Sequence, residues 1–369
     1  MRGGAVSASP LGLPMTLREL PQSTSIIGQR QMREQNIRTL DDALVQANGV
    51  SRQIYGSNRA GYNYLFARGS RITNFSIDGL NAGDSLQDAG NAATAAYERV
   101  EVVRGANGLL YGAGEPSASV NLVRKRPTRT PQAQIALHAG SYRQNGASAD
   151  VSGSLNDAGT LRGRAVADFH HGRTWREREK SRDFSLYGIA EYDVTPATRL
   201  HAGAHYQQAR ETAASSHSTV TYDNAGYATP LGVHYNPSAD WAYSRTRTLN
   251  LFAGVQHQFR NGVQGKVEYS YTKRDWDHPY GVAGILGINH NTGAADMITG
   301  YWRDRPHTHS LNASLNGSYR LFGREHDWTA GIGGSRSKSS RHGARNIAFN
   351  AVANLDDFSR SGSYPEPAS

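Results

Sequence analysis

Cysteine is absent from this sequence of 369 residues. The chain therefore has no disulfide framework, no thiolate metal site and no cysteine nucleophile. Runs of about eighteen apolar residues are absent too, which excludes a transmembrane helix. A transmembrane β-barrel also lacks such runs, because its strands alternate between lipid-facing and inward-facing residues. A membrane location through strands therefore stays open.

Signatures of phosphate and nucleic-acid binding are also missing. Residues 100–128 contain closely spaced glycines, but a β-strand pattern follows them, so no helix N-terminus is available to hold a phosphate. The net charge of +9 permits an anionic partner. The basic residues are scattered among apolar ones, however, which is typical of solvated faces rather than of a nucleic-acid site. No catalytic constellation is visible, and we expect no enzymatic activity.

The chain divides near residue 131. Before this point, Thr39 is expected to cap a helix over residues 40–47, with Asp42 in an approximate capping box. Strand patterns bounded by turn residues occur at 23–27, 64–67, 75–78 and 99–103. These features predict a compact α+β domain of a size that can close its own core.

After residue 131, apolar and polar residues alternate over long stretches. Residues 249–259 place leucines, Ala253, Val255 and Phe259 on one face and polar residues on the other, with Phe252 as an exception. The same alternation occurs at 161–170, 263–272 and 311–321. About nine such strands are expected, each with one apolar and one polar face.

The predicted connections alternate in length. Short turns occur at 156–159, 195–198, 260–262 and 322–325, whereas residues 211–244 and 276–307 are long polar stretches. An outer-membrane barrel has tight turns on its periplasmic side and long loops outside. A soluble β-sandwich explains the alternation but not the segregation of loop lengths, so the pattern favours the barrel.

Four segments carry a family resemblance. They are LRELPQSTSIIGQRQMREQNIRTLDDALVQANGV from residue 17, LFARG from 65, FSIDGL from 75 and YERVEVVRGANGLLYGAGEPSASVNLVRKRPT from 97. In this order they resemble the plug domain of TonB-dependent outer-membrane receptors, most closely the ferric-siderophore group. The resemblance implies an α+β plug domain followed by a transmembrane antiparallel β-barrel. We expect a leader remnant at 1–16, the plug at 17–131 and a partial barrel at 132–369.

The implied function is energised uptake of a ferric siderophore across the bacterial outer membrane. The implied partners are outer-membrane lipid and the inner-membrane TonB complex, although no coupling peptide is evident in residues 1–16. Arg68 and Arg104 resemble the plug arginines that pair with barrel glutamates and hold the plug against the wall. The basic cluster at 124–126 is expected to be interfacial or strand-flanking. No resident cofactor or metal site is expected, since the iron arrives held by its chelator.

Candidate ligand contacts are aromatic residues, arginines and a glutamine, which suit a siderophore with flat aromatic or hydroxamate groups. In the plug they are Tyr55, Arg59, Tyr62 and Gln87. In the long polar stretches they are Trp241, Tyr243, Trp276, Tyr280, Tyr301 and Trp302. The alternative for the wall aromatics is membership of the interfacial girdle of a barrel.

Some features depart from the family pattern. Such a receptor has about twenty-two strands, no signal peptide precedes the plug pattern, and the last residues, SGSYPEPAS, are not a barrel strand. We therefore expect a non-functional or partial fragment. Import of haem, cobalamin or a sugar, or a soluble β-rich binding module, are the alternative functions.

Overall fold

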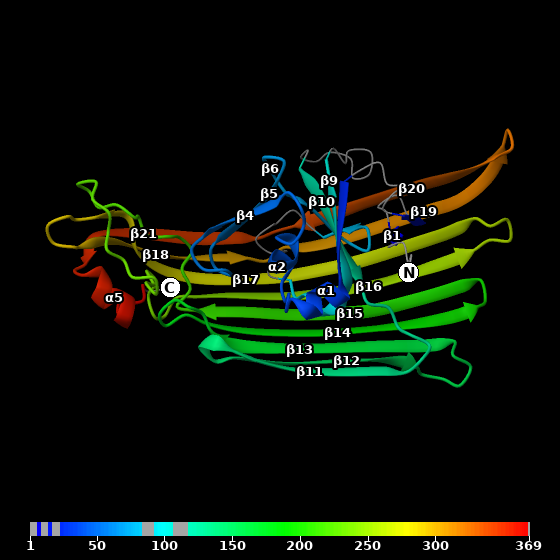
Figure 1. Cartoon of the computed structure of the whole chain (residues 1–369), viewed down its shortest axis with the longest axis horizontal. Coiled ribbons are helices and arrows are strands. Elements are labelled where there is room, and N and C mark those ends of the chain that lie inside the picture. Colours follow the sequence, from blue (N-terminus) through cyan, green and yellow to red (C-terminus); the bar gives the residue numbers. More distant parts are fainter. Residues whose placement is uncertain (1–5, 9–13, 17–22, 83–91, 106–116, 368–369) are drawn as a thin grey trace.

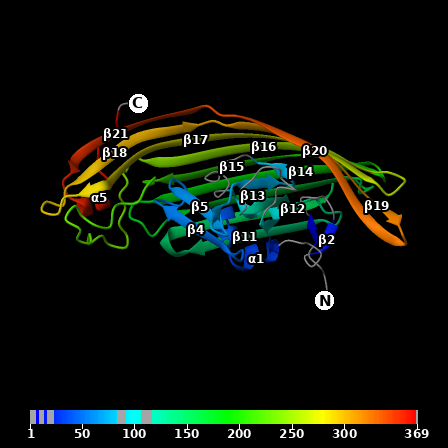
Figure 2. The ribbon, with the colours of Figure 1, turned by 90° about the horizontal axis from the view of Figure 1, so that it is seen from above.

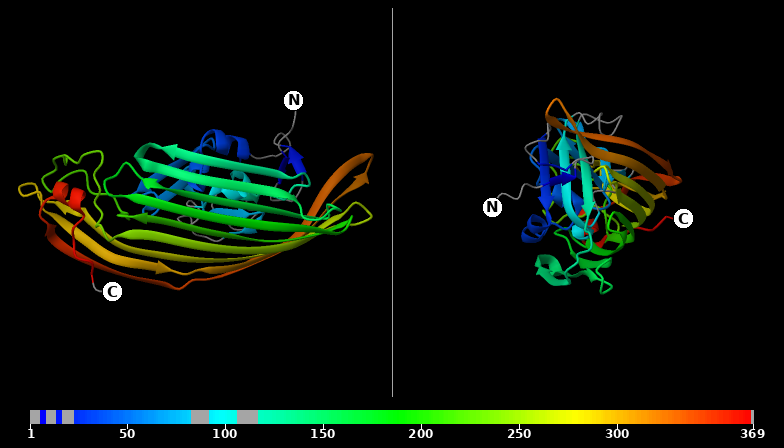
Figure 3. Two further views of the ribbon diagram at one scale, coloured as in Figure 1. Left: turned by 90° about the horizontal axis from the view of Figure 1, so that it is seen from below. Right: turned by 90° about the vertical axis from the view of Figure 1, so that its right-hand side faces the viewer.

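The computed structural model describes residues 6–8, 14–16, 23–82, 92–105 and 117–367. A long curved sheet, the wall, runs the length of the molecule, and a smaller mixed domain, the plug, lies against its concave face (Figures 1 and 2). Figure 3 shows the same arrangement along the strands, with the wall bending around the plug. No helix in the described residues is long and apolar enough to cross a membrane.

The plug is built from short elements around one core. In chain order they are β3 Ser23–Gly28, α1 Gln29–Glu34, α2 Leu40–Leu44, β4 Val50–Tyr55, β5 Tyr62–Ala67, β6 Ser70–Arg71, β7 Asn74–Ile77, β8 Leu80–Asn81, η1 Thr94–Ala96, β9 Tyr97–Arg104 and β10 Ala118–Arg124. A separate two-stranded sheet, β1 Val6–Ala8 and β2 Pro14–Thr16, lies before them in the chain, within the range expected to be a leader remnant. Strands β3, β9, β10, β7 and β8 form a five-stranded sheet in that order, and β4, β5 and β6 form a second sheet. Leu40, Leu44, Ile72, Val100 and Val120 are fully buried between these elements.

The predicted helix starts as expected. The hydroxyl of Thr39 accepts a hydrogen bond from the backbone N–H of Asp42, which satisfies one free donor at the start of α2. The helix ends at Leu44 rather than residue 47. Helix α1 and strand β4 were not predicted, and α1 buries only Met32, so it has no apolar periodicity to detect.

The wall consists of long antiparallel strands. They are β11 Gln132–Gly140, β12 Gln144–Ser154, β13 Leu161–Arg173, β14 Lys180–Thr195, β15 Thr198–Thr212, β16 Tyr243–Gln258, β17 Gln264–Ile288, β18 Ala295–Asp304, β19 His307–Leu321, β20 Arg324–Lys338 and β21 Arg341–Val352. A 3-10 turn, η2 Ser141–Arg143, joins β11 to β12, and helix α5 Leu355–Ser361 follows β21. Consecutive strands from β11 to β18 pair in order.

The eleven strands of this sheet occupy nine positions across it, because β18 and β19 lie end to end, as do β20 and β21. The partner of β17 changes from β18 to β19 without a change of register, since Trp276 pairs with Asp304 and Lys273 pairs with His307. Proline at 306, which has no N–H to donate, lies at the break. Strands β20 and β21 continue each other in the same way. The expected count of about nine is therefore confirmed, and within the described residues the sheet is open, with β11 at one edge.

The four predicted short turns are confirmed, and they lie at one end of the wall, together with the ends of β12, β14, β16 and β19. The long connection 213–242 lies at the other end. The second predicted long loop, 276–307, is wrong: β17 continues to Ile288 and β18 returns from Ala295. Polar residues there occupy strands, and a sequence pattern of polar residues does not distinguish a wetted strand from a loop.

The two faces of the wall differ as the alternation predicts. Phe169 and Leu251 are exposed on the convex face. Asn250 and Arg164 are buried on the concave face, which the plug covers. The exception, Phe252, is only 4% exposed and packs with Tyr187 against the plug. The plug has its own core, so the wall and plug are separate units in contact.

Candidate ligand site between the plug and the wall

The tip of the β4–β5 hairpin, residues 56–61, docks into the wall near the long connection. We call this the upper contact. The hydroxyl of Ser57 donates to the Glu179 carboxylate and accepts from the N–H of Ser215 at 2.9 Å and from Arg176 Nη1 at 3.2 Å. Ser57 is fully buried. The loop is therefore held by polar bonds to two separate connections of the wall.

Arg59 is the charged centre of the upper contact. Its guanidinium pairs with the carboxylate of Asp183 on β14, and its backbone N–H donates to Glu211 Oε2 on β15 at 3.0 Å. The Ser244 hydroxyl donates to its carbonyl at 3.3 Å. The side chain is only 14% exposed. The residue predicted as a ligand contact therefore has a carboxylate partner in the wall.

Glycine is required at position 56. Gly56 has φ +81°, a conformation that L side chains rarely adopt. A Cβ atom there would lie 2.3 Å from the carbonyl oxygen of Ser215. The close approach of the two backbones lets Gly56 N–H reach the Ser218 hydroxyl at 3.1 Å. Any other residue would push the loop off the wall.

Three aromatic side chains of β17 form a stack on the inner face, beside the upper contact. The rings of Trp276 and His278 are 5.7 Å apart, and those of His278 and Tyr280 are 5.5 Å apart. Trp276 Nε1 donates to the hydroxyl of Ser244 at 3.2 Å, and Ser244 in turn reaches Arg59. His278 Nε2 has no hydrogen-bond partner among the described residues. The predicted residues Arg59 and Trp276 thus meet through Ser244, whereas Tyr280 lies further along the stack and, like His278, is fully buried.

The other wall aromatics separate by face. Trp302 pairs across the sheet with His278 and shares its inner face. Tyr243 and Tyr301 lie on the outer face, where Tyr243 donates to Asp277 at 3.0 Å and Tyr301 lies under the Arg303 guanidinium. These two fit the girdle alternative. Trp241 donates to the carbonyl of Tyr364 at 2.8 Å and packs in the loop cluster around α5.

The plug carries a second aromatic group on the β4–β5 sheet. Tyr55 is 41% exposed, and its ring meets that of Tyr64 edge-on at 6.2 Å. Phe66 continues the row at 6.5 Å, and the Arg71 guanidinium lies 4.4 Å from the Tyr64 ring. This surface offers ring faces and positive charge to a ligand. The Tyr62 side chain and Gln87 lie outside what the structure describes.

A second junction, the lower contact, joins the end of β10 to the wall. Arg124 Nη1 binds Asp78 at 2.8 Å, Nη2 donates to Asn250 Oδ1 at 2.6 Å, and the guanidinium lies 3.9 Å from the Phe252 ring. Lys125 binds Asp150 at 2.8 Å. The cluster predicted to be interfacial therefore lies at the plug–wall interface, where Arg124 is only 2% exposed.

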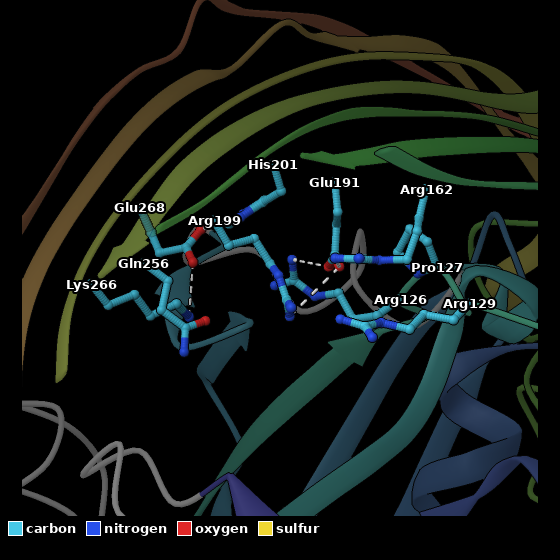
Figure 4. Close-up of a pocket in the computed structure, with 10 residues that line it drawn as sticks. All are labelled: Arg126, Pro127, Arg129, Arg162, Glu191, Arg199, His201, Gln256, Lys266 and Glu268. Atoms are coloured by element: carbon cyan, nitrogen blue, oxygen red, sulfur yellow. Dashed lines mark hydrogen bonds and ion pairs between the residues drawn. The ribbon is translucent and has the colours of Figure 1, made fainter. Parts of the chain in front are cut away.

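A cavity of about 350 Å³ lies next to the lower contact, toward the short turns of the wall (Figure 4). Its charges are paired with one another: Arg126 and Arg162 approach Glu191 at 3.5 and 3.6 Å, and Lys266 binds Glu268 at 2.9 Å. None of the predicted ligand contacts lines it. The aromatic site at the upper contact is the better candidate for ligand binding.

Neighbouring arginines keep the Asp78 carboxylate of the lower contact ionised. Burial raises the pKa of the Asp78 carboxyl, but Arg124 and Arg126 lower it more, so the pKa of Asp78 lies well below its usual range. Burial lowers the pKa of Lys125, and Asp150 opposes this through a hydrogen bond. No sequence pattern pointed to Asp78, Asp150 or Asn250 as partners, because they lie far from the cluster along the chain.

The two predicted lock arginines lie on the plug. Arg104 donates to the carbonyl of Asn48 and to the hydroxyl of Ser23, both within the plug. Arg68 has φ +53°, and its Nη1 lies 3.1 Å from where a Cβ of Gly105 would be. The structure brings both arginines to the same end of β9. Their role as a lock stays a prediction.

Known proteins share the sequence pattern and the fold of this chain. Residues 16–119 match the family model described as TonB-dependent Receptor Plug Domain. The chain belongs to the TonB-dependent receptor family. It is 32% identical over 328 residues to the ferric-pyoverdine BN7/BN8 receptor of Pseudomonas putida, a match that covers 88% of this chain and 40% of the relative. The ferripyoverdine receptor of Pseudomonas aeruginosa is 32% identical over 341 residues, covering 89% and 41%.

Solved structures agree with the sequence matches. The crystal structure of the ferripyoverdine receptor of the outer membrane of Pseudomonas aeruginosa bound to ferripyoverdine superposes with a TM-score of 0.89 at 28% identity. That match covers 98% of this chain and 48% of the other. The TonB-dependent receptor chain thus spans about two fifths of the length of its curated relatives. Its relatives are outer-membrane receptors, and its wall matches part of their barrel.

Proposed function

We propose that this chain forms the plug and part of the wall of an outer-membrane receptor that takes up a ferric siderophore. The observation that carries the proposal is the upper contact. There, a plug loop is fixed beside Trp276, His278 and Tyr280 on the inner face of the wall. Ring faces and guanidinium groups suit a chelate with flat aromatic or hydroxamate groups.

A pyoverdine is the first siderophore to test. Relatives named as ferric-pyoverdine receptors align over most of this chain, as do ferrioxamine B receptors of Salmonella typhimurium, at 30% identity over 269 residues. The aromatic site lies on the side of the long connection 213–242, where a ligand arriving from outside would first meet the plug. Tyr55 and the rings beside it would extend the site across the plug surface.

Transport requires that the plug move. In the proposed mechanism, an inner-membrane TonB complex binds the receptor that holds ligand at the upper contact, and this complex supplies the energy. Arg68 and Arg104 are proposed to fasten the plug to barrel glutamates in the resting receptor. The chain contributes binding and gating, and no covalent step is involved.

Iron uptake in a deletion strain tests the proposal. The gene that encodes this chain is deleted, and uptake of radiolabelled iron is measured with ferric pyoverdine, ferrioxamine B and haem. We expect loss of uptake from one ferric siderophore and normal uptake from haem. Unchanged uptake of every iron chelate, together with lost uptake of another nutrient such as cobalamin or a sugar, would reject the proposal and favour that ligand.

A further inference from the structure

Four arginines lie in one line across the outer face of the wall. Arg182 pairs directly with Arg210, Arg210 with Arg245, Arg245 with Asp277, and Asp277 with Arg303. The line crosses five neighbouring strands, from β14 to β18. We call the four arginines the arginine row. Asp277 is the single carboxylate within it.

The row faces away from the plug. Side chains of consecutive strand residues point to opposite faces. Asp183 and Glu211, which bind Arg59 of the plug, are the neighbours of Arg182 and Arg210 along their strands. Arg182, Arg210 and Arg303 are exposed. The row is therefore presented to the surroundings of the wall.

Like charges directly opposite each other in a sheet repel, because their Cβ atoms are only about 5 Å apart. Asp277 relieves part of this repulsion, with Oδ2 2.8 Å from Arg245 and Oδ1 3.3 Å from Arg303. Within the described residues, no carboxylate lies within 4.0 Å of the guanidinium of Arg182 or Arg210. Arg210 instead lies 5.0 Å from the Tyr243 ring. The row thus leaves uncompensated positive charge.

The row lies at the border of an apolar band. Toward the short turns, the next outward residues on β14 are Phe184 and Leu186, which are 38% and 49% exposed. On β16, the exposed Arg247 and then Leu249 come before Leu251, which is 42% exposed. Toward the long connections, Lys180 follows on β14 and adds another exposed positive charge. A strip of cations at the edge of a lipid-facing band is at the height of lipid headgroups.

We propose that the arginine row binds the phosphate groups of a lipid headgroup in the leaflet on the side of the long connection 213–242. Guanidinium groups bind phosphate through two parallel hydrogen bonds, and adjacent strands space them for a headgroup with more than one phosphate. Tyr243 and Tyr301 place amphipathic rings beside the row, as is common where one end of a ring is apolar and the other wet. The lipid relieves the repulsion that the protein itself leaves.

The test measures binding of lipid A, a glycolipid with two phosphates, to the purified receptor in neutral detergent. Three forms are compared: the wild type, Arg182→Gln/Arg210→Gln, and the control Arg260→Gln/Arg324→Gln. The control removes the same charge from exposed positions at the short turns. We expect the double variant of the row to bind about 25-fold more weakly, and Arg182→Gln alone about fivefold. The control should bind like the wild type.

Three results would overturn the proposal. They are equal binding by the row variant, an equal loss in the control variant, and equal binding of lipid A after its phosphates are removed. Thermal unfolding without lipid checks that the row variant is folded. Because it has lost a like-charge contact, its Tm should equal or exceed that of the wild type, whereas added lipid A should raise the Tm of the wild type more.

Discussion

The upper and lower contacts both join the plug to the wall through arginine and carboxylate groups, but they are built differently. In the lower contact, the plug supplies three consecutive cations, and Arg124 and Lys125 have close carboxylate partners at 2.8 Å. In the upper contact, the plug supplies one cation, Arg59, to a site with the carboxylates of Glu179, Asp183 and Glu211. The lower contact therefore takes its cations from three consecutive plug residues, whereas the upper contact takes one cation from the plug and one, Arg176, from the wall, where it lies 3.6 Å from Glu179.

The two contacts also differ in their place along the chain. The lower contact lies where β10 leads into the wall, so covalent connection keeps its partners near each other. The upper contact is the tip of a hairpin, held only by non-covalent bonds, and the aromatic stack adjoins it. We therefore propose that the lower contact anchors the plug and that ligand acts on the upper contact.

The largest effect is expected from Arg124→Ala. The substitution leaves Asp78 buried with less positive charge beside it, and removal of one partner of a buried ion pair costs about 3–5 kcal/mol. We expect a loss of that order in the free energy of unfolding of the plug, measured by denaturant titration. Arg129→Ala is the control, because that side chain is 78% exposed and lies 3.9 Å from Asp193. If both substitutions lower the free energy of unfolding equally, Arg124 is no more an anchor of the plug than the exposed Arg129.

A smaller and more local effect is expected from Arg59→Ala. The loop 56–61 loses its ion pair with Asp183, at a cost of about 2–3 kcal/mol. Hydrogen exchange should then accelerate in residues 56–61 and stay unchanged in β9 and β10. If β9 and β10 exchange faster as well, the upper contact is an anchor too, and the comparison fails.

The smallest expected effect is a pH dependence of plug stability, which distinguishes Asp41 in the plug interior from Asp78 in the lower contact. Burial raises the pKa of Asp41 to about 6, and this side chain is 4% exposed. A raised pKa means that the charged form destabilises the fold, so plug stability should rise as pH falls from above 6 to about 4. Asp41→Asn should remove this dependence and stabilise the plug at neutral pH by about 2–3 kcal/mol.

Two comparisons make the pH result specific. Glu34→Gln changes an exposed acid on α1 and should leave the pH dependence intact. The lower contact should behave oppositely to Asp41, since the lowered pKa of Asp78 stabilises the fold above its ordinary pKa and loses that stabilisation only in stronger acid. Unaltered pH dependence in Asp41→Asn would show that another group is responsible.

Local patterns in the sequence predicted much of the fold. The capping of α2 by Thr39, the short turns of the wall and the alternation of its faces depend on neighbouring residues. The partners of Arg124 were not predictable, because Asn250 lies 126 residues away and reaches it only through the curvature of the wall around the plug. Phe252 was a visible exception to the alternation, and its contact with Arg124 explains why an apolar residue faces inward.

The candidate site was predicted in composition rather than in arrangement. Trp276 and Tyr301 were equivalent in the sequence, as aromatic residues in what was predicted to be one loop. Both lie on strands, and the alternation along β17 and β18 turns Trp276 inward and Tyr301 outward. A register error of one residue would exchange their faces, which is why a loop prediction could not distinguish them.

Ligand affinity of matched inner and outer variants tests the central claim most directly. Binding of ferric pyoverdine to the purified receptor is measured for the wild type, Trp276→Ala and Tyr301→Ala, with thermal unfolding as the check on folding. We predict that Trp276→Ala binds about tenfold more weakly, because a stacking face beside the upper contact is lost, and that Tyr301→Ala binds like the wild type. Equal affinity of all three forms, or a loss confined to Tyr301→Ala, would contradict a ligand site at the upper contact.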